Sequence, residues 1–235
     1  MRSILSLICF VVFTAVMATT GIVLNVIFNK RSFDDSVLQV WASGACWLFN
    51  VKVHVVDIRK FNSSKGAIVL FNHSSFMDVL AIASVLRGIR FGAKIELFKI
   101  PIFGYCMRRL GMLPIARNKR EEVFKVYQEA QSRFEKGDKI ALSPEGGRFH
   151  GSSLSSFKSG PFVFALNAGV PLLPVVVKGA YDVWPKGSIL ANPDKWMRQV
   201  SVHVLDPIST QGYTLDERTK LQNESYEVMN DVYRN

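Results

Sequence analysis

The feature that most constrains this chain is a long uncharged segment at its N-terminus. No charged residue occurs between Arg2 and Lys30, and most residues between them are apolar. A helix needs about 20 apolar residues to span a membrane, so residues 3–28 are long enough. A cleaved signal peptide is the alternative, but the apolar run continues past the small-residue site at residues 16–18. We expect a retained membrane helix, and Lys30 and Arg31 favour a cytoplasmic location for its carboxyl end.

A second apolar segment follows at residues 36–49. It is too short to span comfortably, and Trp41 and Trp47 suit the membrane–water interface. Two interpretations are open: the segment lies beside the first helix as part of a monotopic anchor, or it packs on the core of the following domain. We predict a membrane anchor of two apolar helices over residues 1–50 and one further domain over residues 51–235.

From residue 51 onward, patterns typical of strands and helices alternate. Strands are expected at residues 51–56, 67–71, 89–93, 139–142, 172–178 and 199–205, and helices at residues 79–86, 121–136, 161–168 and 215–233. Repeated β–α units predict an α/β fold with a mostly parallel sheet covered by helices. The chain of 235 residues has room for one such domain and an appendage.

The charge of the chain indicates an anionic partner. Its formal net charge is +10, which favours a membrane surface, a phosphate-bearing substrate, an acidic carrier protein or nucleic acid. Basic residues are concentrated at residues 87–120, where they are interleaved with apolar side chains. That combination fits a surface that meets both lipid headgroups and acyl chains.

His73 and Asp78 follow the expected strand at residues 67–71. With His73 in the turn and Asp78 in the next helix, the carboxylate could fix one imidazole nitrogen and leave the other as a base. On a continuous helix this spacing would separate the two side chains by about 140°. The alternative is an ordinary helix start, with Asn72 or Ser74 as the N-cap residue.

A second polar turn follows the expected strand at residues 139–142. It contains Glu145, Gly146, Gly147 and Arg148. The glycines allow close approach of the backbone to a ligand, and the Arg148 guanidinium suits a phosphate. A plain glycine turn with a surface ion pair is the alternative.

Four short blocks occur in order between residues 67 and 178. They are His73 with Asp78; Lys94, Glu96, Leu97, Pro101 and Gly104, continued to Arg117; Glu145 to Arg148; and Val170, Pro171 and Pro174. With these blocks the sequence resembles the 1-acylglycerol-3-phosphate acyltransferases, within the wider glycerolipid acyltransferases. It departs from the family pattern at Gly147, where Thr or Ser is usual, and at Ala116, where an acidic residue is common.

The resemblance implies a glycerolipid acyltransferase fold, with the acyltransferase domain at residues 51–235. It also implies transfer of a fatty acyl group from acyl-CoA or an acyl carrier protein to a lysolipid hydroxyl, giving phosphatidic acid from 1-acylglycerol-3-phosphate. His73 would be the general base and Asp78 its orienting carboxylate. The residues implied to bind the acceptor or shape its site are Lys94, Arg117, Glu145, Gly146, Gly147 and Arg148. No metal or other cofactor is expected. The expected partners are membrane lipids rather than nucleic acid. The expected location is the inner or plasma membrane, with the active site on the cytoplasmic face.

Three other functions remain as alternatives at this point. The first is acylation of a different lysolipid, such as a lyso-ornithine lipid or a lysophospholipid. The second is a membrane-tethered lipid hydrolase with Ser74 or Ser75 as nucleophile, although adjacent Ser and His rarely form a triad and no G-x-S-x-G turn is present. The third is a non-catalytic basic adaptor that binds membrane or nucleic acid.

Overall fold

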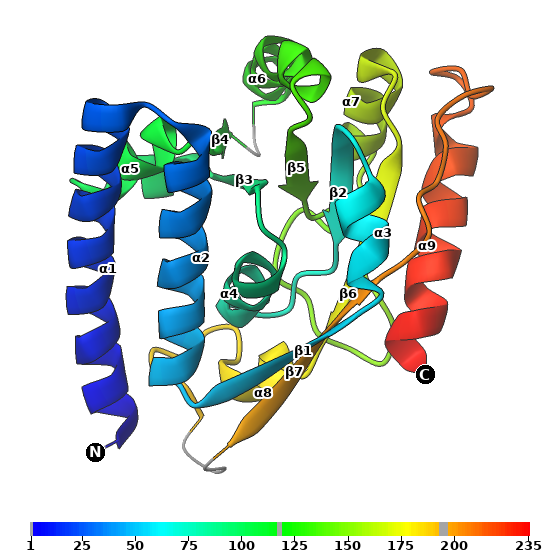
Figure 1. Ribbon diagram of the computed structural model, residues 1–235. Coiled ribbons are helices and arrows are strands. Elements are labelled where there is room, and N and C mark those ends of the chain that lie inside the picture. Colours follow the sequence, from blue (N-terminus) through cyan, green and yellow to red (C-terminus); the bar gives the residue numbers. More distant parts are fainter. Residues whose placement is uncertain (1, 117–118, 193–196) are drawn as a thin grey trace.

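A seven-stranded sheet organises the chain in a computed structural model that describes residues 2–116, 119–192 and 197–235 (Figure 1). Its strands are β1 (Val51–Val56), β2 (Ala67–Phe71), β3 (Ile89–Lys94), β4 (Leu113–Ile115), β5 (Lys139–Leu142), β6 (Leu172–Lys178) and β7 (Arg198–Val204). Their order is β1-β7-β6-β2-β5-β3-β4. The β6–β7 pair is antiparallel and the other pairs are parallel, so the expected mostly parallel α/β sheet is confirmed.

The two faces of the sheet have separate hydrophobic clusters because successive strand residues point to opposite faces. In β2, Val69 and Phe71 belong to one cluster, while Ile68 and Leu70 belong to the other. All five residues of β2 are buried, as expected for a central parallel strand covered on both faces. β2 is therefore a rigid support for whatever follows its carboxyl end.

Helices cover both faces (Figure 1). The first cluster contains residues of α1 (Arg2–Phe28), α2 (Arg31–Leu48), α4 (Phe76–Val85) and α8 (Ala180–Val183); the second contains residues of α6 (Arg120–Glu135), α7 (Gly160–Ala168) and α9 (Arg218–Arg234). The shorter elements are α3 (Ile58–Ser63), the 3-10 helix η1 (Ile95–Lys99) and α5 (Phe103–Arg109).

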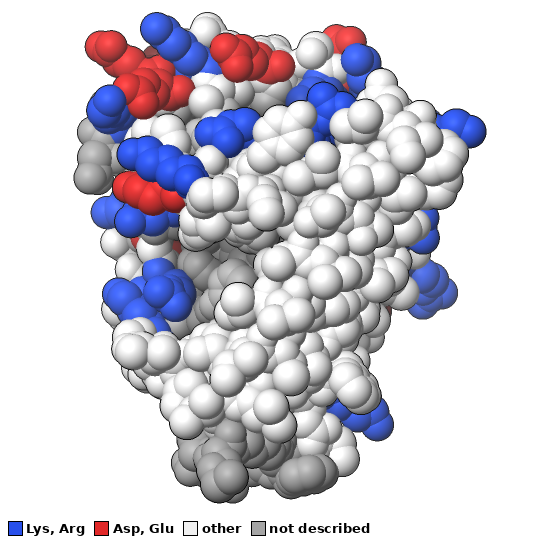
Figure 2. Space-filling view, turned by 90° about the vertical axis from the view of Figure 1, so that its left-hand side faces the viewer, with Lys and Arg blue, Asp and Glu red and all other residues white. Residues whose placement is uncertain are grey.

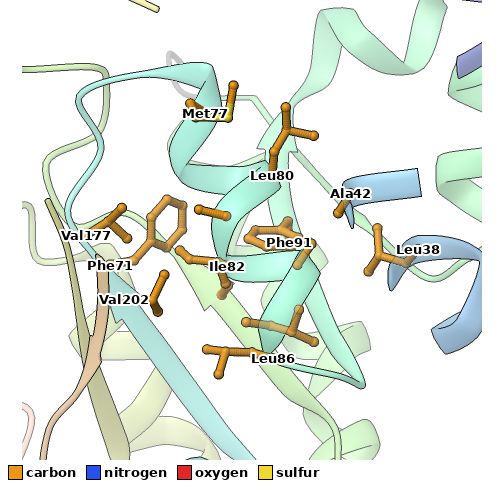
Figure 3. Close-up of a cluster of buried hydrophobic side chains, with 14 of the residues drawn as sticks. Leu38, Ala42, Phe71, Met77, Leu80, Ile82, Leu86, Phe91, Val177 and Val202 are labelled. Atoms are coloured by element: carbon orange, nitrogen blue, oxygen red, sulfur yellow. The ribbon is translucent and has the colours of Figure 1, made fainter. Parts of the chain in front are cut away.

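Helix α4 is apolar on all sides because it is enclosed between the sheet and α2. Figure 3 shows Leu80 of α4 and Leu86, which directly follows α4, among Phe71 and Phe91 of the sheet and Leu38 of α2. Leu80 and Leu86 are fully buried. A helix that is hydrophobic all round is typical of such an enclosed position, which fixes the start of α4 relative to β2.

The two N-terminal helices differ in character. Helix α1 contains the Ser3–Phe28 segment, which is long and apolar enough to cross a membrane. Only 17% of an apolar stretch of 18 residues in this segment is buried inside the protein. Helix α2 is not a second apolar helix of the same kind. It starts at Arg31, carries Asp34 and Asp35 in its first turns, and buries Leu38 and neighbouring apolar residues against the core.

The expected pair of apolar anchoring helices is thus wrong for its second member, and the interpretation that residues 36–49 pack on the core is the one that holds. The reason is that one side of α2, with Val37, Leu38 and Ala42, is buried against the core, whereas its apolar residues Val40 and Trp47 are exposed on the other side. No helix or strand was predicted in the turn-rich segment between residues 94 and 117, and the structure forms η1, α5 and β4 there. Arg117 itself lies outside the described residues.

Candidate active site

The predicted site residues follow the carboxyl ends of neighbouring strands. His73 comes after β2, Glu145 after β5 and Lys94 at the end of β3, and these strands are adjacent in the order β2-β5-β3. Val69 of β2 and Phe91 of β3 both pair with Ala141 of β5. His73 and Glu145 lie four residues beyond this level and Lys94 three, so the sheet presents all three at one edge, where α/β proteins commonly bind ligands.

His73 and Asp78 contact each other at this edge. His73 Nδ1 lies 3.1 Å from Asp78 Oδ2. The Asp78 side chain is fully buried and that of His73 is 15% exposed. The carboxylate can hold the proton on Nδ1, which leaves Nε2 as the nitrogen able to accept a proton.

The turn holds Asp78 through the backbone. The N–H groups of Ser74 and Ser75 each donate to Asp78 Oδ2 at 2.7 Å. Ser75 is the N-cap of α4, because its hydroxyl accepts from the Met77 N–H at 3.1 Å, and Asp78 completes a capping box. The N-cap is therefore Ser75 rather than Asn72 or Ser74, and the helix start and the His73–Asp78 contact coexist instead of excluding each other.

Asn72 fastens the same turn to the next strand. Its side chain donates to the Val177 carbonyl at 2.9 Å and accepts from the Val177 N–H at 2.7 Å. Asn72 is nearly fully buried, so these two bonds satisfy its amide where water cannot. This positioning role was missed in the sequence, where Asn72 was considered only as a helix cap.

Glu145 joins the two polar turns. One carboxylate oxygen accepts from the His73 N–H at 2.8 Å and the other from the Ser155 N–H at 3.2 Å. Burial raises the pKa of the Glu145 carboxyl to about 7, although both hydrogen bonds oppose this rise. Glu145 is thus a positioning residue for the His73 backbone rather than part of an exposed glycine turn.

The expected acceptor-binding residues are more exposed. Arg148 is exposed and has no ion-pair partner in the part of the chain that the structure describes. The Lys94 side chain is 57% exposed, and its Nζ lies 3.7 Å from Glu96 Oε1. Gly146 has a positive φ of 69°, a conformation that glycine adopts without strain, while Gly147 follows it in the same turn. The alternative interpretation, a plain glycine turn with a surface ion pair at Arg148, is therefore not supported by the described residues.

Comparison with known proteins identifies the family of this chain. A family model described as Acyltransferase matches residues 52–178, which is more than half of the chain. The chain belongs to the acyltransferase family. The resemblance stated from the four sequence blocks is confirmed by this match and by the names of its relatives.

Relatives of the acyltransferase occur in several organisms. A 1-acyl-sn-glycerol-3-phosphate acyltransferase from Haemophilus influenzae is 27% identical, over 97% of this chain and 92% of the relative. The chloroplastic LPAT1 enzyme from Arabidopsis thaliana, named as a 1-acyl-sn-glycerol-3-phosphate acyltransferase, is 29% identical over 76% of this chain. This match spans only 53% of the plant protein, and that with the Brassica napus relative BAT2 spans 55%, so the chain matches about half the length of these relatives.

A solved structure supports the fold of the acyltransferase. The crystal structure of the 1-acyl-sn-glycerophosphate acyltransferase PlsC from Thermotoga maritima aligns with a TM-score of 0.83. The alignment covers 99% of this chain and 96% of the other, with 23% identity. At this identity the likeness shows the shared α/β architecture alone.

The two serines of the turn do not have the environment of a hydrolase nucleophile in this acyltransferase. The Ser75 hydroxyl donates to the Trp184 carbonyl at 2.6 Å and is buried. The Ser74 hydroxyl lies 3.5 Å from Asp78 Oδ1. An activated serine needs its hydroxyl within reach of the histidine base, whereas these hydroxyls are directed to other groups.

Proposed function

We propose that this protein transfers a fatty acyl group from a thioester to the free hydroxyl of 1-acylglycerol-3-phosphate, forming phosphatidic acid. The observation that carries the proposal is the His73–Asp78 contact of 3.1 Å, with Asp78 buried and held by two backbone N–H groups. The relatives that are 1-acyl-sn-glycerol-3-phosphate acyltransferases supply the acceptor class.

The reaction uses His73 as a shuttle for one proton. Its Nε2 accepts the proton of the acceptor hydroxyl as the oxygen attacks the thioester carbonyl, and Asp78 stabilises the resulting imidazolium. The C–O ester bond forms, the C–S bond breaks, and the imidazolium proton passes to the departing sulfur. A thioester is already activated, so no covalent enzyme intermediate is required.

Cationic residues at the same sheet edge suit the acceptor phosphate. We assign Arg148 and Lys94 to this phosphate, with Arg117 as a third candidate and Gly146 and Gly147 giving it access to the turn backbone. Arg148 is exposed and Lys94 is the last residue of β3, the strand next to β5. A phosphate monoester carries close to two negative charges at pH 7, so the two cations roughly neutralise it. The donor is acyl-CoA or acyl carrier protein.

Helix α1 suits attachment to a membrane. Its outward side exposes a series of large apolar side chains, including Ile8, Val12 and Val16, and Figure 2 shows a broad surface free of charge on this side of the molecule, with most Lys and Arg near its margins. We propose that α1 enters the inner or plasma membrane with the active site on the cytoplasmic face. The 77% exposed Trp47 of α2 is then placed for contact with the interface.

The test is an acyl-transfer assay with purified full-length protein. The acyl donor is either labelled acyl-CoA or acyl carrier protein loaded with a labelled acyl group. Each donor is incubated with lysophosphatidic acid, a lyso-ornithine lipid or lysophosphatidylcholine. We expect labelled phosphatidic acid from lysophosphatidic acid. Product from another lysolipid would move the acceptor assignment, free fatty acid alone would indicate a hydrolase, and no turnover with any pair would overturn the proposed function.

A further inference from the structure

A cavity of about 290 Å³ lies beside the catalytic turn, next to β6. Ser74, which directly follows His73, forms part of its wall, and Val177 and Lys178 at the end of β6 form another part. Asn72 fixes this wall through its two hydrogen bonds to the Val177 backbone. The cavity is thus attached to the same turn that carries the catalytic histidine.

Segments distant in the sequence are joined at the rim of this cavity. The His150 ring stacks on the Tyr181 ring of α8, with centroids 3.6 Å apart and planes 4° from parallel. The Tyr233 hydroxyl of α9 donates to the Gly151 carbonyl at 3.3 Å. These contacts hold the loop after Arg148 against both helices, so the cavity is preformed rather than a gap between independent surface loops.

The cavity lining has an excess of positive charge. Lys178 and Arg234 contribute cations, and Asp182 is the single carboxylate in the lining among the residues that the structure describes. Neither cation has an ion-pair partner in the described part of the chain. Two unpaired cations beside stacked aromatic rings suit an anionic organic ligand better than an apolar one.

The sheet order separates this cavity from Lys94, one of the cations assigned to the acceptor phosphate. His73 follows β2, which lies between β6 on one side and β5 and β3 on the other. Lys178 is the last residue of β6 and Lys94 the last residue of β3, while Arg148 lies in the loop that follows β5. A base that serves two anionic substrates needs each of them to approach from a different side. The sheet places Lys178 on one side of His73 and Lys94 on the other.

We propose that the cavity beside β6 binds the phosphate-bearing arm of the acyl donor, the phosphopantetheine that coenzyme A and acyl carrier protein share. This inference rests on the proposed function, because it takes the second substrate to be a thioester. The volume of about 290 Å³ is at the low end for ligand pockets, roughly 300–1,000 Å³. It therefore suits the arm and its phosphate rather than a whole coenzyme.

The decisive experiment compares donors with and without phosphate in the full-length enzyme. Acyl-CoA and acylated acyl carrier protein are compared with an acyl-N-acetylcysteamine thioester, which has the reactive group but no phosphate. For Lys178→Gln combined with Arg234→Gln, we expect the ratio of kcat/KM for acyl-CoA to that for the truncated thioester to fall about 10-fold, as loss of charge-assisted contacts predicts. The acceptor KM is measured in parallel and should not change.

Matched controls test whether the effect depends on position. Lys52→Gln removes a strand lysine and Arg218→Gln an arginine from the same helix as Arg234, and neither residue lines the cavity. Asp182→Asn removes the negative charge from the lining and should lower the KM for acyl-CoA, a gain that misfolding cannot produce. An unchanged donor ratio in the double variant, or an equal change in the controls, would overturn the proposal.

The two phosphate-bearing donors identify which source the cavity recognises. Loss with both donors supports binding of the shared phosphopantetheine phosphate, whereas loss with only one of them would overturn the assignment to the shared arm. Binding of free coenzyme A by calorimetry separates this proposal from the proposed function. Binding that weakens in the double variant, without any acyl transfer, would reject the function and retain the cavity assignment, whereas transfer with an unchanged donor ratio would do the reverse.

Discussion

His73 is the residue on which the proposed chemistry depends. Replacing it by alanine removes the proton acceptor but leaves the Asp78 hydrogen bonds to Ser74 and Ser75 in place. We expect His73→Ala to lower kcat by about 10²- to 10⁴-fold, the usual contribution of general acid–base catalysis, with little change in thermal unfolding. Transfer kinetics with lysophosphatidic acid measure the effect, and turnover close to wild type would exclude His73 as the base.

Asp78 should behave differently from His73 because it is both an orienting group and a helix cap. Asp78→Ala removes Oδ2, the single oxygen that accepts from both the Ser74 and the Ser75 N–H groups. We expect a lower kcat together with a loss of about 1–3 kcal/mol in the free energy of unfolding, the cost of leaving buried donors unsatisfied. Denaturant unfolding alongside kinetics checks this, and a loss of activity at unchanged stability would contradict the capping role.

Glu145 gives the fold a dependence on pH. Its folded pKa of about 7 is above the value of 4.5 for a free glutamate, so the folded state favours the protonated form. The stabilisation is fully present below about pH 4.5 and is lost as pH rises through 7, by about 3 kcal/mol in total. The neutral Glu145→Gln variant should lack this loss.

Denaturant unfolding near pH 5 and near pH 8 tests the prediction for Glu145, since these values lie on either side of most of the titration. The quantity of interest is the difference in free energy of unfolding between wild type and Glu145→Gln, because the contributions of the other titrating groups cancel in it. That difference should shift in favour of Glu145→Gln as pH rises. Parallel pH curves for the two proteins would show that Glu145 ionises as an ordinary carboxyl.

The sequence was more informative about the catalytic pair than about what holds it. The spacing of His73 and Asp78 allowed a contact only across a turn, and the structure has this contact. The two hydrogen bonds between Asn72 and Val177 join residues 105 positions apart, and no local pattern encodes such a pairing. The link from Glu145 to the His73 N–H also depends on β2 and β5 being neighbours, which a sequence does not state.

At the scale of elements, strands were easier to predict than the second helix. The strands at residues 51–56, 67–71, 139–142 and 172–178 have the expected bounds, because apolar or alternating runs between turn residues are specific for buried strands. Residues 36–49 are apolar enough to suit either a membrane surface or a protein core. The choice depends on α4 and the sheet, which bury one side of α2.

An ion pair connects α2 to the sheet and allows this packing to be tested. Arg90 Nη2 of β3 lies 2.6 Å from Asp35 Oδ1 of α2, and the two side chains are 4% and 14% exposed. The contact is an ion pair without the alignment of a hydrogen bond. We expect Asp35→Ala to cost about 3 kcal/mol of unfolding free energy, because it leaves a buried guanidinium unpaired. Chemical denaturation in detergent measures the loss.

A double variant separates the charge effect from lost packing. Asp35→Leu combined with Arg90→Met replaces the buried pair by apolar side chains, an exchange that is often neutral or stabilising. It should recover most of the stability that Asp35→Ala loses. If the double variant is as unstable as the sum of its single changes, the two side chains do not interact.

At the scale of the whole molecule, α1 has to satisfy two environments. On one side, Phe10 is buried among aromatic rings that include Phe49 and Trp184, and the Trp41 Nε1 donates to the Thr14 hydroxyl at 3.0 Å. On the other side, large apolar residues such as Ile8, Val12 and Val16 are more than half exposed. Deleting α1 would uncover the protein core as well as removing the membrane contact, so point substitutions on the outer side are the sharper test.

Ile8→Lys combined with Val12→Lys places two charges on that outer side. These residues are 56% and 59% exposed and lie one turn apart, so the substitutions should leave the melting temperature in detergent nearly unchanged. A lysine at the centre of a membrane helix costs about 2.5–3.5 kcal/mol, and two should release a large share of the protein from membranes washed with high salt. Val228→Lys, at a 41% exposed position on α9, is the matched control and should remain bound. Equal retention of both variants in the membrane pellet would mean that α1 does not enter the apolar layer and that the basic surface alone holds the enzyme there.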